Sequence, residues 1–282
     1  MILLRSCCSL TGNSQRFQSA RRALRTRRHG ARVTSIISHE QILGLNGRHV
    51  VTLEPGWRMG ACALHPFAIA ALEQLRHDAR AAGFDLRVVS GFRSFMRQAE
   101  IWNAKAAGLR PVLDANEQPI DTGTLSEREL VFAILRWSAL PGASRHHWGS
   151  DMDVVDAAAI PPGYDLRLSI DETRAGGPFV PLHRWLGERI ASGRAHGFFR
   201  PYTGAGCDVA PEPWHLSFAP LAWECQRAFD PAALRRAHRD VRLALQPVIE
   251  DCCEEILGRY FQVPAALYAS VRQPDTVVEV IT

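Results

Sequence analysis

The chain has 282 residues, of which 46% are hydrophobic and 22% are charged, proportions typical of a folded globular protein. No stretch approaches the ~20 consecutive apolar residues that a membrane-spanning helix requires, so no membrane span is expected. The net charge is +4, and it falls to −4 for residues 33–282 once the eight arginines of residues 1–32 are left out, which excludes a strongly basic nucleic-acid-binding body.

Residues 1–45 are expected to form an Arg-rich extension outside the folded body, either disordered or spurious, because residues 1–32 contain no acid. Three interpretations stay open: an arm that binds acidic polymers, a targeting peptide, or translated sequence upstream of a true start near Val33. A secretory signal fits poorly, because no apolar core of ~7–15 residues follows the charges. As written, the sequence would be cytoplasmic, whereas a misassigned start would allow an extracytoplasmic location.

Hydrophobic spacing predicts the elements of the body that follows. The expected helices cover 64–82, 94–108, 126–140 and 180–197, the expected strands cover 84–90, 151–156 and 212–218, and the expected loops cover 109–126 and 157–180, the second with a hairpin around 164–180. Ser94 is a candidate N-cap, and Ser126 with Glu129 forms the capping-box pattern. After Pro220 the composition is helical through 231–261.

Short strands separated by helices favour an α+β fold, in which helices pack on a small, mainly antiparallel sheet. We expect the folded domain to span residues 46–222 and a helical C-terminal extension, for which the sequence indicates no role, to span 223–282. Seven cysteines without a Cys-x-x-Cys spacing suit a reduced compartment or plain packing, and not a disulfide scaffold.

The stretch "SRHHWGSDMDVVD", residues 144–156, concentrates the candidate chemistry. On its expected strand, Asp151 and Asp153 share one face, and a buried carboxylate needs a cation, a set of donors or a metal. Taken alone, Asp153 is more often salt-bridged to an arginine than bound to a metal. His146 lies upstream across a turn at Gly149 that can return it beside the strand, and imidazole nitrogen with carboxylate oxygen suits zinc.

The stretch "EPWH" supplies a candidate third ligand and a candidate base, His215 and Glu212. Their spacing places them on opposite sides of a regular strand, and Pro213 disfavours a helix interior. A bend between them is therefore needed to aim both side chains at one centre, and the spacing does not define that bend. On its own, Glu-x-x-His is a weak signal.

Three motifs occur together in order: "SGFRS" at 90–94, Ser-x-His-x-x-Gly-x-x-x-Asp at 144–153 and "EPWH" at 212–215. The combination resembles the VanY-type D-alanyl-D-alanine carboxypeptidases and the wider LAS group of zinc peptidases, over roughly residues 57–220. The resemblance implies Zn²⁺ as cofactor, bound at a single site in the domain 46–222. Its ligands would be His146, Asp153 and His215.

The resemblance also implies the remaining roles. Glu212 becomes the general base for a zinc-activated water, and Arg93 becomes the group that binds the scissile carbonyl. Ser144 and Gln98 fall on family positions near the substrate. Three protein ligands leave a fourth zinc position for water, whose pKa the metal lowers to roughly 7.

Three positions need separate comment. Phe92 replaces the tyrosine that is common in the family, so a hydroxyl contact is lost there while the ring can still pack. Asp151 stands where alanine is usual, and it either hydrogen-bonds a ligand histidine or points to solvent. We expect His147 to support the ligands or to face the substrate, and not to bind the metal itself.

The implied function is that of a zinc-dependent metallopeptidase that hydrolyses a peptide bond in bacterial cell-wall stem peptides, with D-Ala-D-Ala carboxypeptidase as the leading activity. An L,D-carboxypeptidase, a phage-lysin-like wall endopeptidase and a non-catalytic zinc-binding module stay open as alternatives. A purely structural zinc site would need neither Glu212 nor Arg93. The expected partner is a peptidoglycan stem peptide or another D-Ala-D-Ala-type peptide, and nucleic acid is not expected.

Overall fold

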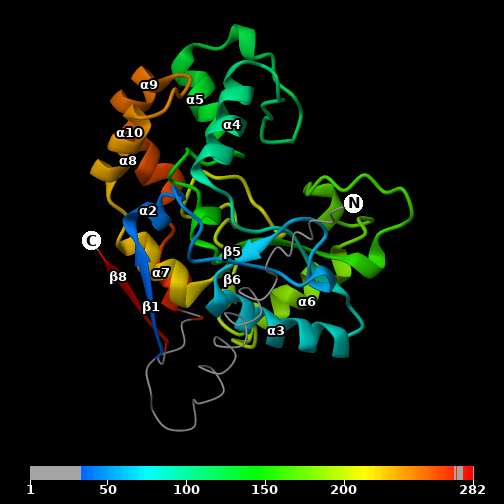
Figure 1. Cartoon of the computed structure of the whole chain (residues 1–282). Helices are drawn as coiled ribbons and strands as arrows, with labels where there is room; N and C mark the ends of the chain where they lie inside the picture. Colours follow the sequence, from blue (N-terminus) through cyan, green and yellow to red (C-terminus); the bar gives the residue numbers. More distant parts are fainter. Residues whose placement is uncertain (1–32, 270, 272–275, 282) are drawn as a thin grey trace, which may run out of the picture.

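A four-stranded sheet lies at the centre of the computed structural model, which describes residues 33–269, 271 and 276–281 (Figure 1). The strands run in the order β4 (Leu86–Ser90), β5 (Asp151–Asp156), β7 (His215–Phe218) and β6 (Phe198–Phe199), each antiparallel to its neighbour. This arrangement confirms the α+β fold with a small antiparallel sheet. Every residue of β5 and β7 is buried, so the acids of β5 lie inside the protein.

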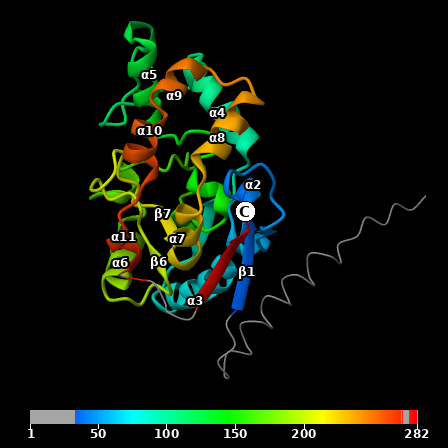
Figure 2. The same ribbon diagram turned by 90° about the vertical axis from the view of Figure 1, so that its left-hand side faces the viewer.

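Two short strand pairs lie outside this sheet. β2 (Val51–Thr52) pairs with β3 (Ala63–Leu64) in antiparallel fashion, whereas β1 (Val33–Ser38) and β8 (Thr276–Ile281) are parallel. The β1–β8 pair brings both ends of the described chain together (Figure 2). Residues 1–32, which make up most of the predicted extension 1–45, lie outside the described residues.

Four helices lie within the expected helical segments: α3 (Pro66–Ala81), α4 (Phe95–Ala106), α5 (Glu127–Leu135) and α6 (Val180–Ala191). Shorter helical turns are α2 (His39–Ile42), η2 (Pro55–Trp57) and η3 (Thr122–Thr124). Ser94 caps α4 by accepting a hydrogen bond from the Arg97 backbone N–H at 3.2 Å, and the predicted capping box of α5 is complete. α6 ends before residue 197 because Gly193 adopts a left-handed φ of +68°.

The segment 157–180 contains no hairpin, so that prediction is wrong. It holds short 3-10 turns instead, η5 (Ala157–Ala159) and η6 (Asp171–Thr173). The carboxylate of Glu172 accepts hydrogen bonds from the backbone N–H groups of Arg167, at 3.1 Å, and Ser169, at 2.9 Å. A carboxylate therefore takes the backbone donors that a strand ladder would have used.

Helical segments follow the central sheet: α7 (Ala219–Arg227), α8 (Pro231–Arg239), α9 (Gln246–Asp251), α10 (Cys253–Ile256), the π-helix η7 (Leu257–Phe261) and α11 (Ala265–Ala269). Figures 1 and 2 both place α8, α9 and α10 with α4 and α5 at one end of the molecule, away from α3 and α6. Leu234, Ile249 and Ile256 join the same hydrophobic core as α3 and the sheet. The domain boundary at residue 222 stays a prediction. Within the described ranges, no helix has both the length and the apolar character that crossing a membrane would require.

Candidate active site

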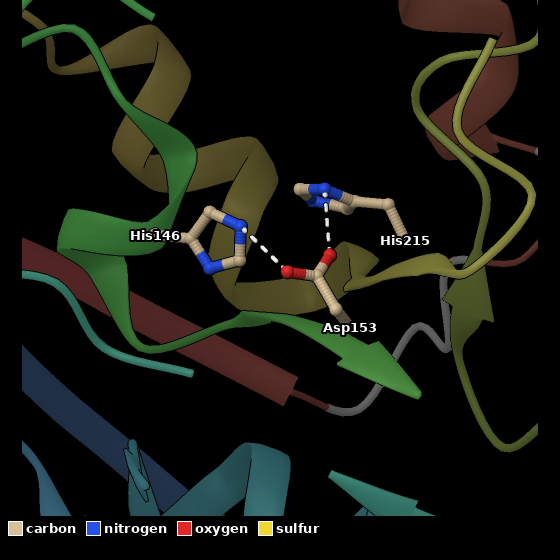
Figure 3. Close-up of side chains that lie close together, drawn as sticks. All are labelled: His146, Asp153 and His215. Atoms are coloured by element: carbon tan, nitrogen blue, oxygen red, sulfur yellow. Dashed lines mark ion pairs between the residues drawn. The ribbon is translucent and has the colours of Figure 1, made fainter. Parts of the chain in front are cut away.

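The three candidate metal ligands converge beside the central sheet. His146 comes from the 3-10 turn η4 (Arg145–Trp148), Asp153 comes from β5, and His215 opens β7 directly opposite Asp153 in the antiparallel register. Each residue offers one ligand atom, and these atoms all lie within 4.8 Å of one another. Figure 3 shows both imidazole rings facing the Asp153 carboxylate, with His146 Nε2 at 3.6 Å and His215 Nδ1 at 3.5 Å from its oxygens.

Gly149 returns the chain from η4 to β5, as the sequence predicted. Its φ is +68°, a left-handed conformation that side chains with a Cβ rarely adopt. A Cβ at this position would also lie 2.9 Å from the backbone nitrogen of His65. The turn that carries His146 back to Asp153 therefore requires glycine for both conformation and space.

The ring of His146 is oriented by the turn that precedes α4. Its Nδ1 donates a hydrogen bond to the carbonyl oxygen of Gly91 at 2.9 Å, which leaves the Nε2 lone pair directed toward Asp153. Burial, together with the charges of Arg93 and His215, holds the pKa of His146 well below its usual range. The imidazole is therefore neutral, as a metal ligand must be.

His215 is held from behind by Asp151. The His215 Nε2 lies 3.0 Å from Asp151 Oδ1, and Asp151 also accepts hydrogen bonds from Arg145 Nε at 2.8 Å and from the Ser150 hydroxyl. Asp151 therefore points into the protein, where it contacts a candidate ligand histidine, and does not point to solvent. Burial opposes ionisation of Asp151, but Arg145 and His215 outweigh it and lower the pKa of this carboxyl. A carboxylate that orients an imidazole in this way strengthens it as a metal ligand.

Arg145 connects this carboxylate to the C-terminal helices. Its guanidinium donates to Tyr268 Oη and to Ser217 Oγ, both at 2.6 Å, and the Tyr268 hydroxyl donates to Gln226 Oε1 at 2.7 Å. All these side chains are buried. A continuous polar network therefore runs from α11 and α7 to the candidate ligand His215.

Asp153 has no comparable set of partners. Burial raises its pKa to about 6, although His215 and Arg93 act in the opposite direction. Its Oδ1 is buried and has no hydrogen-bond partner among the residues that the structure describes. A carboxylate oxygen that accepts no hydrogen bond and the free nitrogen of a neutral imidazole face one point, and both are preferred zinc ligands. The donor set therefore fits a zinc ion.

A tight turn supplies the bend between Glu212 and His215 that their spacing left undefined. The His215 backbone N–H donates to the Glu212 carbonyl at 3.1 Å, and Pro213 occupies the second position of the turn, where its fixed φ is favourable. Arg200 holds the turn from outside by donating to the Pro213 carbonyl at 2.8 Å. As a result, Glu212 Oε2 lies 3.0 Å from His215 Nδ1, on the side where the candidate ligands meet.

Arg93 lies in the turn between β4 and α4. Its backbone N–H donates to the carbonyl of His146 at 3.1 Å, which ties this turn to η4. The Arg93 Nη1 donates to Gln98 Oε1 at 2.9 Å, and Gln98 in turn donates to the Ala139 carbonyl at 2.7 Å. Burial lowers the pKa of Arg93, opposed by Asp153 and Glu212, and a guanidinium keeps its charge at neutral pH.

Ser144 and Gln98, both predicted to lie near the substrate, differ in whether they line the cavity. Ser144 lines the cavity next to His146. Gln98 is fully buried and is not among the lining residues, and both ends of its amide are used by Arg93 and Ala139. Gln98 thus holds Arg93 in place from behind the cavity wall, and its contact with a substrate stays a prediction.

His147 is turned away from the candidate ligands. Its Nδ1 donates to the Arg93 carbonyl at 2.6 Å, and its Nε2 accepts from the Gly142 backbone N–H at 3.0 Å. Both ring nitrogens are therefore occupied by backbone groups. The side chain fastens the loop before η4 to the turn that carries Arg93.

A cavity of about 600 Å³ opens over these residues. Its lining includes Arg93, Asp153 and Glu212, together with Trp214 and Tyr202. Tyr202 was not identified from the sequence, because "RPYTG" matches no motif. Its ring packs edge-on against His215, with 5.0 Å between centroids, and its carbonyl accepts from the Glu212 backbone N–H at 3.0 Å. Arg145 was also missed, although it lies inside the quoted histidine motif.

Comparison with known proteins gives the chain several relatives. An uncharacterized protein of Haemophilus influenzae is 31% identical over 123 residues, 43% of this chain and 92% of that protein. Among solved structures, VanYB in complex with D-alanine-D-alanine is 22% identical, with 73% of this chain and 90% of that chain covered and a TM-score of 0.43. The LdcB LD-carboxypeptidase is 21% identical, with 73% and 78% covered and a TM-score of 0.42.

The family comparison covers the region that holds all three motifs. Residues 61–221 match VanY, described as D-alanyl-D-alanine carboxypeptidase, and this match spans more than half of the 282 residues. It includes the strands β5 and β7, the turn η4 with His146, and the two turns that carry Glu212 and Arg93. The chain therefore belongs to the VanY family of D-alanyl-D-alanine carboxypeptidases.

Proposed function

We propose that this protein is a zinc-dependent carboxypeptidase that releases the terminal D-alanine from D-Ala-D-Ala stem peptides of the bacterial cell wall. Membership in the VanY family supports a cell-wall peptidase. The observation that carries the proposal is one cavity that contains the His146–Asp153–His215 group, the Glu212 carboxylate and the Arg93 guanidinium. A structural metal site would need neither of the last two groups.

The metal would be held by His146 Nε2, one oxygen of Asp153 and His215 Nδ1. When bound, zinc supplies a polarised water and a Lewis acid for the scissile carbonyl. Hydrogen bonds to Asp151 and Glu212 outweigh the effect of burial and raise the pKa of His215 to about 10, so the metal-free protein holds a proton there. Binding of the metal must displace that proton.

Glu212 acts as the general base and then as the general acid. Its carboxylate lines the cavity beside His215 and accepts a proton from the water whose oxygen adds to the carbonyl carbon. The C–N bond then breaks, and Glu212 delivers the proton to the leaving amine nitrogen of D-alanine. One C–O bond therefore forms, one C–N bond breaks, and the proton taken from the water ends on the amine. Water is the only reactant besides the peptide.

Arg93 stabilises the negative charge that develops on the carbonyl oxygen. Its guanidinium is fixed by Gln98 and held partly out of water, where a permanent positive charge is most effective. Loss of one such donor commonly lowers the rate by about 10²–10³-fold.

The decisive experiment measures bound zinc and D-alanine release in parallel. Glu212→Gln should keep about one zinc per chain and lose hydrolysis, whereas His215→Ala should lose zinc as well. Mass analysis of products from defined muropeptides separates D,D-carboxypeptidase, L,D-carboxypeptidase and endopeptidase activity. Full activity after removal of the metal would refute the proposal.

A further inference from the structure

Two cations that the proposed reaction does not use lie on the wall of the same cavity. Lys105, the only lysine in the sequence, is in the last turn of α4, and Arg110 follows that helix. The chain reverses at Gly108, whose φ is +70°, and the backbone N–H groups of Leu109 and Arg110 both donate to the Ala104 carbonyl, at 2.8 and 3.1 Å. This reversal brings Arg110 back beside the turn that carries Lys105.

Neither cation has an anionic partner in the part of the chain that the structure describes. No hydrogen bond or ion pair joins the Lys105 ammonium or the Arg110 guanidinium to another side chain there, whereas Arg167, which also lines the cavity, pairs with Asp165 at 3.1 Å. Lys105 is also partly withdrawn from water. Burial, then the charges of Arg110 and Arg93, lower the pKa of Lys105 to about 8, and Glu212 acts against that shift.

The position of the pair relates it to the reacting groups. Lys105 and Arg110 line the same cavity as Arg93 and Glu212, so the two cations share one space with the proposed catalytic groups. Lys105 is partly buried, and an unpaired, partly desolvated cation is unfavourable unless an anion joins it, whereas Arg110 is exposed and adds its charge from the mouth of the cavity. Charge-assisted hydrogen bonds from ammonium and guanidinium groups to carboxylates are among the strong polar contacts.

We propose that Lys105 and Arg110 form a subsite that binds a carboxylate of the peptide substrate. The inference deepens the proposed peptidase function and rests on it. The carboxylate could be the free C-terminus of the peptide or an acidic side chain upstream of the scissile bond. Recognition of the C-terminus would make the enzyme an exopeptidase, because an internal peptide bond offers no carboxylate at that place.

The test uses the zinc-loaded full chain and three peptides that end in D-Ala-D-Ala and carry one acidic residue upstream. One peptide has both carboxylates free, the second has a C-terminal amide, and the third has an amide in place of the upstream carboxylate. Lys105→Met and Arg110→Gln should each raise KM for the first peptide by about tenfold or more, with kcat little changed. Arg97→Gln is the matched control, because Arg97 lies on the exposed side of α4 and pairs with Glu100 at 2.7 Å.

Lys105→Met and Arg110→Gln should no longer raise KM when the carboxylate that the subsite binds is replaced by an amide. The amidated peptide on which the variants match the wild type therefore identifies that carboxylate. Hydrolysis of all three peptides by both variants at the wild-type KM would overturn the subsite and leave the peptidase function intact. If the wild type cleaves none of the peptides, the proposed function fails. The subsite is then tested separately, by calorimetric binding of the first peptide to the Glu212→Gln variant. Equal affinity with and without the added Lys105→Met change would then refute it.

Discussion

Asp151 and Asp153 show how two identical side chains on one face of a strand acquire different properties. Asp151 makes short contacts with Arg145, Ser150 and His215, whereas one oxygen of Asp153 accepts no hydrogen bond in the described structure and has only the longer contact to His215 Nδ1. The first carboxylate therefore orients a ligand, and the second is available to a metal. The difference arises from the residues that surround each carboxylate and not from the strand that carries both.

Asp151→Asn is expected to weaken zinc binding by about 10–100-fold, because the amide cannot replace the charge that orients His215 and pairs with Arg145. Zinc affinity is measured by competition with a chromogenic chelator. Asp156→Asn on the same strand is the control, since its carboxylate accepts from the backbone N–H groups of Asp85 and Ala158, away from the ligands. Equal zinc affinity in wild type and Asp151→Asn would contradict the role of Asp151.

Lys105 predicts a pH dependence that separates it from the other groups in the cavity. With a pKa of about 8, it is charged below that pH and neutral above it, so its attraction for a carboxylate should fade as pH rises through 8. Arg110 and Arg93 favour loss of the proton, and Glu212 opposes it. We expect kcat/KM to fall above about pH 8 in the wild type, mainly through KM.

Lys105→Arg provides the matching control, because a guanidinium stays charged across the same range. The decline of kcat/KM above about pH 8 should therefore be absent or shifted upward in this variant. An identical pH profile in the two proteins would assign the decline to another group.

At the scale of elements, the C-terminal helices have a structural connection to the candidate metal site. Tyr268 on α11 and Gln226 on α7 hold Arg145, which holds Asp151. The helices beyond residue 222 thus support the candidate ligand His215 through Arg145 and Asp151. The sequence alone indicated no role for them.

Tyr268→Phe should therefore destabilise the fold and weaken zinc binding together. Loss of the hydroxyl leaves Arg145 Nη1 with only the long contact to Gln226 Oε1, at 3.5 Å, in a buried site, which costs about 1–3 kcal/mol of unfolding free energy. Urea denaturation gives the stability, and chelator competition gives the zinc affinity. Tyr260→Phe on η7, outside this network, should change neither by a comparable amount, and the link fails if both substitutions behave alike.

At the scale of the whole molecule, the cavity is assembled from parts of the chain that are distant in sequence. The loop after α4 and the segment 157–180 both line the cavity, and the Glu117 carboxylate joins them by accepting from the Ile170 backbone N–H at 3.0 Å. The candidate ligands likewise tie η4, β5 and β7 together. A metal bound there would stabilise the fold as a unit.

Zinc should therefore raise the melting temperature. At a free concentration of 100 times its dissociation constant, a ligand that binds only the folded state adds about 2.7 kcal/mol. Calorimetric melts with and without zinc measure this shift, which should vanish in His146→Ala and persist in His196→Ala. His196 is a suitable control because it pairs with Asp78 at 2.9 Å, away from the candidate ligands. A shift that survives in His146→Ala would place the metal elsewhere.

The sequence by itself determined the local elements and the residue types of the candidate site. Ser94, the Ser126–Glu129 capping box, the strand 151–156 and the Gly149 turn depend on interactions within a few residues, and all are present. The ordered motifs also indicated the family to which the chain belongs. These features are readable because their physical causes lie close together in the chain.

Only the tertiary structure decided which polar groups share a partner. The orientation of Glu212, the burial of Asp151, the engagement of both His147 nitrogens and the absence of the expected hairpin all depend on contacts outside the local stretch. Arg145 meets a hydroxyl 123 positions further along the chain, and Asp151 meets His215 across 64. A buried polar group is satisfied by whichever donor or acceptor the packed fold brings within about 3 Å, and periodicity within a segment carries no information about that partner.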